Sequence, residues 1–354
     1  MDATQNNGNK AGREVPRLNR GKWDHPLCTV IVTHRDYSDL VGDALLSVLD
    51  QTYGNWECIV VDDDSSEIER SRLIEIIERL PDRRIRLIQN SECRGQVETF
   101  FAGLSQASGE FVSPLDPDDR WHPAFLEEMV KAHLNETVFC PVASCDQKFL
   151  RIDEGLITGT YLGDLWWKKK MAFPVRIDVN GADPALLFFP NIDSRWVWTS
   201  TSALMVRRRA ARLLIPNRRL GYNSLDAYLA FGAHFLGGTL FLERPLIYRG
   251  VHRRNDYVSD DLFSMSQDQA REGAPKIATE CRRDVVEALF HNGVTRVMKP
   301  RQLSKLLKSH FDKEQMSLLG AQCPEALEFW RNARDKRRKA RSFLRRLWSR
   351  LSPG

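Results

Sequence analysis

The sequence predicts an α/β protein with a mostly parallel β-sheet, helices on both faces of that sheet, and a helical C-terminal extension. Two observations predict this class. Short apolar runs rich in β-branched residues alternate with segments of helical periodicity over the first 135 residues, an order typical of parallel sheets. Acidic clusters directly follow two of the apolar runs, and ligands of parallel sheets bind where the strands end.

The predicted elements alternate regularly along the first part of the chain. Apolar runs predict strands at 27–33, 56–61, 85–88 and 111–115. Apolar residues at helical spacing predict helices at 38–49, 68–77 and 97–104. Pro123 is expected to open a further helix, because proline is well tolerated in a first helical turn.

The second part of the chain has a weaker alternation. Thr199–Arg208 predicts a strand that ends in a basic pair, and Asp226 opens an amphipathic helix that continues to Phe235. From Leu262 onward the chain is polar and helical in pattern. Residues 1–25 are expected to be a disordered tail because they contain few apolar residues.

Composition narrows the class of protein. The chain has 354 residues, of which 42% are hydrophobic and 28% charged, as in soluble globular proteins. It contains no uncharged apolar run of about 18 residues, so no transmembrane helix is predicted. The polar start, Met1–Lys22, predicts no secretion signal. The seven cysteines lack any Cys-x-x-Cys pair and predict reduced thiols in a cytoplasmic protein.

Positive charge is concentrated near the C-terminus. Residues 331–350 contain ten Lys or Arg against one Asp. Apolar residues recur at helical spacing between these charges, at Phe343, Leu344, Leu347, Trp348 and Leu351. Such a basic amphipathic tail, 331–351, suits an anionic membrane surface. The alternative is that its apolar stripe packs on the protein. No nucleic-acid recognition motif accompanies the charge, so no nucleic-acid partner is expected.

The acidic clusters point to phosphate chemistry. Asp116, Asp118 and Asp119 lie within four residues, and carboxylates are hard ligands suited to Mg²⁺ or Mn²⁺, which could hold a diphosphate. Asp63 could accept hydrogen bonds from a base or a ribose hydroxyl. The alternative is a helix cap, in which Asp64, Ser65 or Ser66 caps the following helix. The Gly-rich fingerprints of dinucleotide oxidoreductases and P-loop enzymes are absent.

Several motifs together resemble one family. Leu27–Leu126 is similar to the nucleotide-binding half of a family 2 glycosyltransferase with the GT-A fold. The matching pieces are Thr29–Arg35, Ser47–Glu57, Asp62-Asp63, Gly109–Val112 and Leu115–Trp121. The chain most resembles the branch that assembles bacterial surface polysaccharides. Members of that branch read Gly-Val-x-x-Asn-Phe at Gly95–Phe100, where Thr99 replaces the Asn.

The resemblance implies an enzyme that moves a sugar, with inversion, from a nucleoside diphosphate-sugar to a hydroxyl of a glycan or lipid-linked acceptor. It implies that Asp63 holds the base, that Asp116 contacts the ribose and that Asp118 binds Mg²⁺ or Mn²⁺. Three further residues lie at or near strand ends and either touch ribose or phosphate or belong to ordinary surface contacts: Thr33, Arg35 and Arg94.

The second half supplies the remaining candidates. The resemblance implies a catalytic base on a helix, and Asp226 is the one acidic residue in that window. The alternative is an aspartate favoured by the helix dipole. Tyr248–Asn255 resembles the Tyr-Arg-x-His-x-x-Asn signature of the same branch and predicts a loop. In it, His252 is expected to reach the metal or the diphosphate, and Arg249 the phosphate charge.

These expectations define the predicted organisation. A GT-A domain at 26–258 divides into a nucleotide-binding half, 26–135, and an acceptor half, 136–258, followed by the extension at 259–354. The protein is expected to be peripheral at the inner face of the plasma membrane. Two other functions stay open. A nucleotidyltransferase would lack the Asp226 helix and the Tyr248–Asn255 loop, and an inactive nucleotide-sugar-binding or scaffold protein would leave cellular glycan unchanged after Asp118→Asn.

Overall fold

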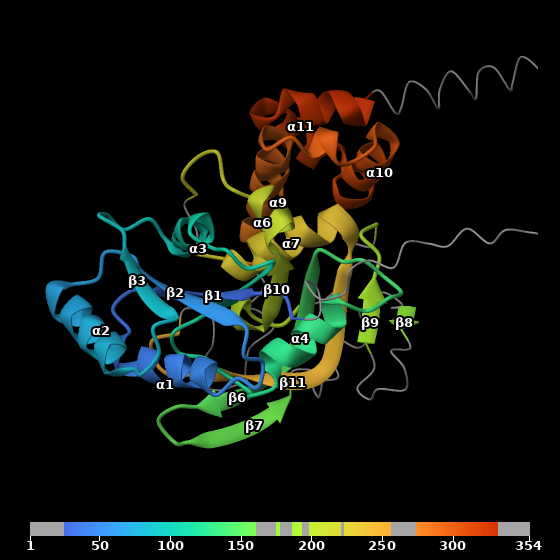
Figure 1. Cartoon of the computed structure of the whole chain (residues 1–354). Helices are drawn as coiled ribbons and strands as arrows, with labels where there is room; N and C mark the ends of the chain where they lie inside the picture. The colour runs from blue at the N-terminus through green and yellow to red at the C-terminus, as the bar shows by residue number, and fades with distance from the viewer. Residues whose placement is uncertain are drawn as a thin grey trace, which may run out of the picture.

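The computed structural model describes residues 25–160, 175–177, 186–192, 198–220, 223–255 and 274–331. The first part alternates strands and helices as predicted (Figure 1): β1 Cys28–His34, α1 Ser38–Leu49, β2 Trp56–Asp62, α2 Glu67–Arg79, β3 Ile85–Gln89, α3 Gln96–Ser105, β4 Phe111–Leu115, β5 Arg120–Trp121 and α4 Phe125–His133. The second part contains β6 Val142–Arg151, β7 Leu156–Thr160, β8 Val175–Ile177, β9 Leu186–Phe189, β10 Leu204–Arg207, α6 Arg208–Arg212, α7 Leu225–Gly237 and β11 Thr239–Val251.

The described strands form one sheet in the order β3-β2-β1-β4-β10-β6-β11-β9-β8, with β5 beside β11 and β7 beside β6. β1, β2, β3 and β4 are mutually parallel, and β6 is parallel to β11. β10 lies antiparallel between β4 and β6 and joins the two parts. The predicted α/β class, with a mostly parallel sheet flanked by helices, is confirmed.

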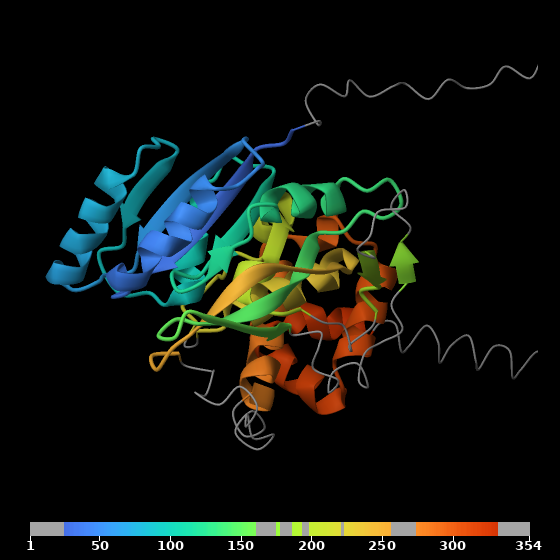
Figure 2. The same ribbon diagram turned by 90° about the horizontal axis from the view of Figure 1, so that it is seen from below.

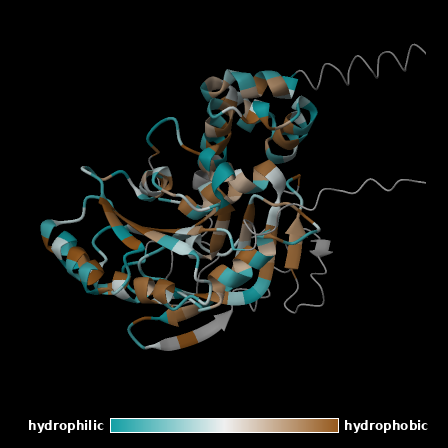
Figure 3. Cartoon of the chain, viewed as in Figure 1, coloured by the Kyte–Doolittle hydropathy of each residue, from teal (hydrophilic) through white to brown (hydrophobic). Residues whose placement is uncertain are grey.

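Helices cover both faces of the parallel strands. Val30 and Val32 of β1 pack on one face with residues of α1 and α4. Ile31 points to the other face and packs with residues of α3 and α7. Because both faces are covered, every residue of β1 is buried, and Figure 3 shows these central strands as mostly hydrophobic. This burial explains why the strands appear as continuous apolar runs rather than alternating ones.

The C-terminal part is helical, with α9 Ala274–His291, α10 Pro300–His310 and α11 Lys313–Gln322. Apolar residues of these helices share one core with α3 and α7. Figures 1 and 2 both show them at the opposite end of the molecule from α1 and α2. No helix of the described residues is long and apolar enough to cross a membrane. The basic tail lies outside the described residues beyond position 331.

Three predicted elements were wrong in extent. The strand expected at Thr199–Arg208 is limited to β10, because Thr201–Ala203 form a 3₁₀ turn and Arg208 begins α6. α4 begins at Phe125, two residues after Pro123. The loop expected at Tyr248–Asn255 begins only at His252, because Tyr248 is hydrogen-bonded within β11 to β5 and β6.

Candidate functional site

The carboxyl ends of the parallel strands meet at one edge of the sheet. His34, at the end of β1, lies beside Asp62, at the end of β2. β4 lies on the other side of β1 and ends at Leu115, beside Val32. The acidic clusters that follow β2 and β4 therefore reach the same edge, as the alternation of elements predicts. This edge is the candidate site.

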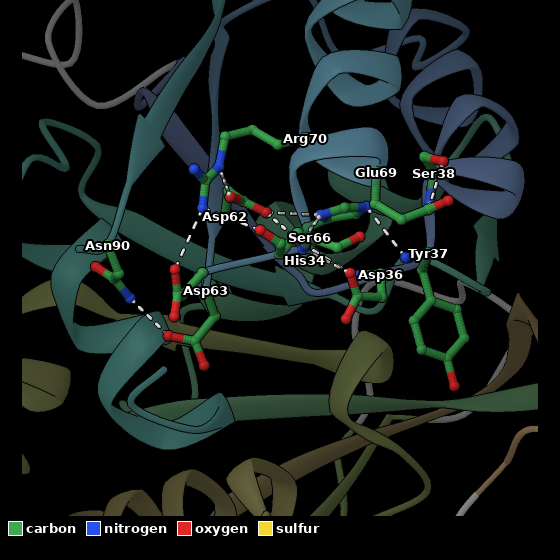
Figure 4. A network of polar contacts seen from close by, with 12 residues as sticks. His34, Asp36, Tyr37, Ser38, Asp62, Asp63, Ser66, Glu69, Arg70 and Asn90 are labelled. Carbon is green, nitrogen blue, oxygen red and sulfur yellow. Dashed lines mark hydrogen bonds and ion pairs between the residues drawn. The ribbon is translucent and has the colours of Figure 1, made fainter. Parts of the chain in front are cut away.

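Asp62 is fully buried and organises the end of β2 (Figure 4). Its carboxylate accepts hydrogen bonds from Ser65 Oγ at 2.5 Å and from Arg70 Nε at 3.2 Å, and lies 3.1 Å from His34 Nδ1. Burial favours the protonated acid, but these partners prevail and hold the pKa of Asp62 at about 2. Because Asp62 is fully buried and bonded to three side chains, it contributes to this edge by holding those side chains in place.

Asp63 organises the loop that leads into α3. Its Oδ1 accepts from Asn90 Nδ2 and from the Arg94 N–H, both at 2.9 Å, and its Oδ2 accepts from the Gly95 N–H at 2.8 Å. Burial opposes ionisation, yet these donors keep the pKa of Asp63 below its usual value. Neither of the two sequence alternatives described this role. The N-cap position of α2 is Ser66, one of the three residues named as candidate caps.

The second acidic cluster is crowded. Burial and the charges of Asp119, Asp118 and Asp226 raise the pKa of Asp116 well above its usual value. Burial and the charge of Asp118 raise the pKa of Asp119 to about 7. Arg249 acts against both shifts, so its guanidinium is the countercharge of the cluster. A cation placed among these carboxyls would relieve their mutual repulsion.

Asp118 is held by the segment that follows β11. Its Oδ2 accepts from Asn255 Nδ2 at 2.9 Å and lies 3.0 Å from His252 Nε2. His252 Nδ1 accepts a hydrogen bond from the Arg254 N–H at 3.1 Å, so a neutral imidazole carries its proton on Nε2 and donates it to Asp118. In this arrangement His252 orients Asp118. To bind a metal through Nε2, as predicted, His252 would have to lose that proton.

The close approach of two backbones fixes this segment. A Cβ atom on Gly250 would lie 2.0 Å from the carbonyl oxygen of Asp118. The Gly250 N–H also donates to Asp119 Oδ1 at 2.8 Å. A glycine at this position of β11 therefore allows the strand to lie directly against the acidic cluster.

Asp226 lies in the first turn of α7 and faces the same cluster. Its Oδ2 accepts from the indole Nε1 of Trp198 at 3.1 Å, and its charge is one of those that raise the pKa of Asp116. The residue is partly exposed. A half-buried carboxylate that accepts this hydrogen bond from a neutral donor retains lone pairs that can take a proton.

The remaining predicted residues lie around this edge. Thr33 is buried near the end of β1. Arg35 follows it, is exposed, and directs Nη1 to Cys93 Sγ at 2.7 Å. Arg94 is exposed, and only its backbone is tied to Asp63. All of the predicted site residues therefore lie at or near this edge: Thr33, Arg35, Asp63, Arg94, Asp116, Asp118, Asp226, Arg249 and His252.

Two of the contacts of the acidic cluster that sequence reasoning missed come from side-chain amides. Asn255 was within the quoted signature but received no role, and it bonds Asp118. Gln96 donates from Nε2 to Asp116 Oδ1 at 2.8 Å. The signature itself was the signal that could have found Asn255. Nothing in the sequence pairs Gln96 with an acidic run twenty residues later.

The carboxylates of the acidic cluster could supply only part of the coordination shell of a divalent cation. Among the described residues, no three His, Cys, Asp or Glu side chains are arranged to hold a metal ion. Mg²⁺ commonly takes one or two protein carboxylates and completes its shell with substrate phosphates and water. The crowded carboxyls of Asp116 and Asp118 suit that chemistry, so the site fits a metal that enters together with a diphosphate.

Comparisons with known proteins agree with this geometry. Residues 28–177 match the profile of Glycosyl transferase family 2. An uncharacterized glycosyltransferase of Haemophilus influenzae is 31% identical over 177 residues, covering 47% of this chain and 67% of that protein. The uncharacterized glycosyltransferase alr2836 of Nostoc is 24% identical over 294 residues, covering 82% of this chain and 84% of that protein.

A shorter match concerns a relative with a named reaction. The UDP-Glc:alpha-D-GlcNAc-diphosphoundecaprenol beta-1,3-glucosyltransferase WfgD of Escherichia coli is 34% identical over 115 residues, which cover 32% of this chain and 44% of WfgD. The chain thus spans less than half of the length of WfgD. Among solved structures, S. aureus TarS 1–349 in complex with UDP-GlcNAc is 14% identical, covers 88% of this chain and 92% of that one, and has a TM-score of 0.49.

Proposed function

Since the chain belongs to glycosyltransferase family 2, we propose that it transfers a sugar from a nucleoside diphosphate-sugar to a hydroxyl group of a glycan or lipid-linked acceptor in surface-polysaccharide synthesis. One observation carries the proposal. The acidic cluster after β4 faces both Asp226 of α7 and the Asp63 side of the same sheet edge. WfgD, whose name describes a lipid-linked acceptor, supports the acceptor class.

In this proposal the donor half binds and the acceptor half moves the proton. Asp63 receives the base, Asp116 the ribose, and Arg249 balances the negative charge of the diphosphate, with Thr33, Arg35 and Arg94 at the rim. Asp226 takes the proton of the acceptor hydroxyl as its oxygen attacks the anomeric carbon and the bond from that carbon to the diphosphate breaks. Because the oxygen attacks opposite to the leaving diphosphate in a single displacement, the configuration inverts. Trp198 orients the Asp226 carboxylate through the indole N–H.

Asp118 is the proposed ligand for Mg²⁺ or Mn²⁺, with His252 and Asn255 holding its carboxylate in place. When bound, the metal would neutralise the departing diphosphate. Asp118→Asn removes the charged ligand but can keep the hydrogen bond from His252. We expect it to abolish Mn²⁺-dependent release of nucleoside diphosphate while leaving the fold intact. Turnover retained in this variant would contradict the metal assignment.

The proposed location is the membrane surface, with the basic tail 331–351 as the main anchor. The described part of the extension supports this. Residues 291–311 contain no acidic residue, and their exposed cations include Arg296, Lys299, Arg301 and Lys305. Each basic residue near the bilayer contributes about 1 kcal/mol to the free energy of binding to anionic lipid headgroups.

The test of the donor class is thermal stabilisation of the purified protein. UDP-, dTDP-, GDP- and CMP-sugars are added with and without Mn²⁺, because a ligand that binds only the folded state raises Tm. A metal-dependent rise with one nucleotide class supports the proposal. No rise with any of them favours the scaffold alternative.

A further inference from the structure

Gln96 lies where the donor half and the acceptor half meet. It is the first residue of α3. Its side-chain Nε2 donates to Asp116 Oδ1 at 2.8 Å, and its backbone N–H donates to Asn223 Oδ1 at 3.4 Å. Asn223 stands two residues before α7, which carries Asp226 in its first turn. One residue thus contacts the acidic cluster and the chain that enters the catalytic helix.

The backbone around Gln96 is tightly constrained. Gly95 has a φ of +89°, a conformation that favours glycine, and its N–H is bonded to Asp63. A Cβ atom on Gly95 would lie 3.2 Å from Asn223 Oδ1. The turn before α3 is therefore held between Asp63 on one side and Asn223 on the other, and the Gln96 side chain extends from this turn to Asp116.

Two more contacts join the same segments. Glu98 accepts a hydrogen bond from the Leu220 N–H, and Arg219 donates from its guanidinium to the Cys93 carbonyl oxygen. Glu98 is also the one acidic residue in the first turn of α3. The segment before α7 thus contacts the Asp63-bound segment through several independent hydrogen bonds, so displacement of one segment disturbs the other.

The electrostatics explain why an amide suits this position. Asp116 lies close to three other carboxylates, those of Asp118, Asp119 and Asp226. A neutral N–H donor stabilises the carboxylate without adding a further charge to the cluster. A glutamate at position 96 would present an acceptor and a fourth nearby negative charge, whereas leucine would leave the Asp116 oxygen without this donor.

We propose that Gln96 and Asn223 are positioning residues for the transfer reaction: the Gln96 amide fixes Asp116 for the donor, and its N–H, through Asn223, fixes the start of the helix that carries Asp226. The proposal rests on the proposed glycosyl transfer and assigns separate effects to the two side chains. Loss of the Gln96 amide weakens donor binding, and loss of the Asn223 oxygen slows the step after binding.

Kinetics of the full-length protein test this separation, with release of UDP from UDP-glucose in Mn²⁺ as the probe reaction. The bond is internal, so its loss weakens donor binding by releasing Asp116 from the orientation that the donor needs, and the energy of a hydrogen bond to a charged group sets the scale at about tenfold. We therefore expect Gln96→Leu to raise the donor KM about tenfold with little change in kcat, and Gln96→Glu to raise it further. Asn223→Ala is expected to lower kcat with an unchanged donor KM.

Two variants serve as controls. Asn223→Asp keeps an acceptor oxygen at the N-terminus of α3, where negative charge is favourable, and should restore kcat. Gln106→Leu changes an exposed glutamine at the other end of the same helix and should alter neither parameter. Equal losses of kcat in Gln96→Leu and Asn223→Ala, or no rescue by Asn223→Asp, would overturn the proposal.

A measurement without ligand separates this inference from the proposed function. Hydrogen exchange of the backbone amides is followed in wild type and in Asn223→Ala. Exchange should increase both in 93–99 and in the first turns of α7, because the two segments hold each other. Unchanged exchange in 93–99 would overturn the coupling, even if the protein accepted another donor. A wild type that uses no sugar nucleotide but shows the coupled exchange would instead overturn only the transfer reaction.

Discussion

At the scale of single residues, the role of each carboxylate in the site depends on which groups already donate hydrogen bonds to it. Asp62 and Asp63 are adjacent, yet Asp62 bonds three side chains of the protein while Asp63 holds a loop through two backbone N–H groups. A base that binds Asp63 must therefore share its oxygens with these donors or replace one of them. The loop at 90–95 is the part of the site that such binding would move.

Asp226 provides the residue-scale prediction. Asp226→Asn keeps an oxygen for the Trp198 indole but cannot take a proton at neutral pH. We expect turnover to fall by about 10²–10⁴-fold while the Kd for the donor stays unchanged, as measured by UDP release and by calorimetry. Asp153→Asn, at an exposed position, is the control. Loss of donor binding in Asp226→Asn would instead assign this aspartate to the donor site.

At the scale of elements, β11 positions the acidic cluster because its backbone packs directly against Asp118. Gly250→Ala would place a methyl group against the backbone of Asp118, so the strand must move. We expect the free energy of unfolding to fall by about 1–3 kcal/mol, as measured by urea unfolding. Gly54→Ala is the control, because its Cβ would have no neighbour within 4 Å. Equal stability of the two variants would show that β11 yields without strain.

The end of α4 supplies a pH prediction. His133 is buried, its ring stacks on Phe111, and its Nε2 lies 2.9 Å from the Met205 carbonyl oxygen. Burial, aided by the charge of Arg207, lowers the pKa of His133 from 6.5 to about 3. Below pH 6.5, His133 is protonated in the unfolded chain but stays neutral in the folded chain. This difference lowers the free energy of unfolding as the pH falls toward 3.

The expected size of this effect is about 2 kcal/mol at pH 5 relative to pH 7.5. His133→Gln keeps a donor for Met205 and should remove that decline, whereas His291→Gln, at an exposed position, should not. Urea unfolding at the two pH values measures both. The comparison between variants is needed because Asp119, whose pKa is raised to about 7, contributes a slope of opposite sign. The same pH dependence in His133→Gln and wild type would refute the assignment.

At the scale of the whole molecule, charge is distributed unevenly. The candidate site lies at the edge formed by the parallel strands, whereas the basic residues of the tail follow α11 in the sequence. The proposed donor site and the proposed membrane contact thus belong to different parts of the chain and can be separated experimentally.

Deletion of 331–354 tests the membrane contact. We expect the shortened protein to leave vesicles that contain anionic lipid and to appear in the supernatant after sedimentation, because ten of the basic residues are removed. Its unfolding midpoint should change little if the tail does not pack on the core. If the shortened protein still sediments with the vesicles, the tail is not the membrane contact, and the exposed cations of 291–311 are the remaining candidate.

The sequence by itself determined the parallel half of this protein. β1, β2, α1 and β4 were predicted to within a residue or two, because strands buried on both faces are continuous apolar runs and helices repeat every three to four residues. The order of these elements also places Asp63 and Asp116 at one edge. The family could be recognised for the same reason, since its motifs lie in short contiguous segments.

The tertiary structure alone decided the contacts between distant segments. The antiparallel insertion of β10, the approach of Gly250 to Asp118, and the bonds of Gln96 to Asp116 and Asn223 join residues separated by tens of positions. No local periodicity encodes such pairs, because they depend on how the two halves of the sheet are joined. The same cause explains why the sequence did not indicate that His252 Nε2 lies 3.0 Å from Asp118 Oδ2 while its Nδ1 accepts from the Arg254 N–H.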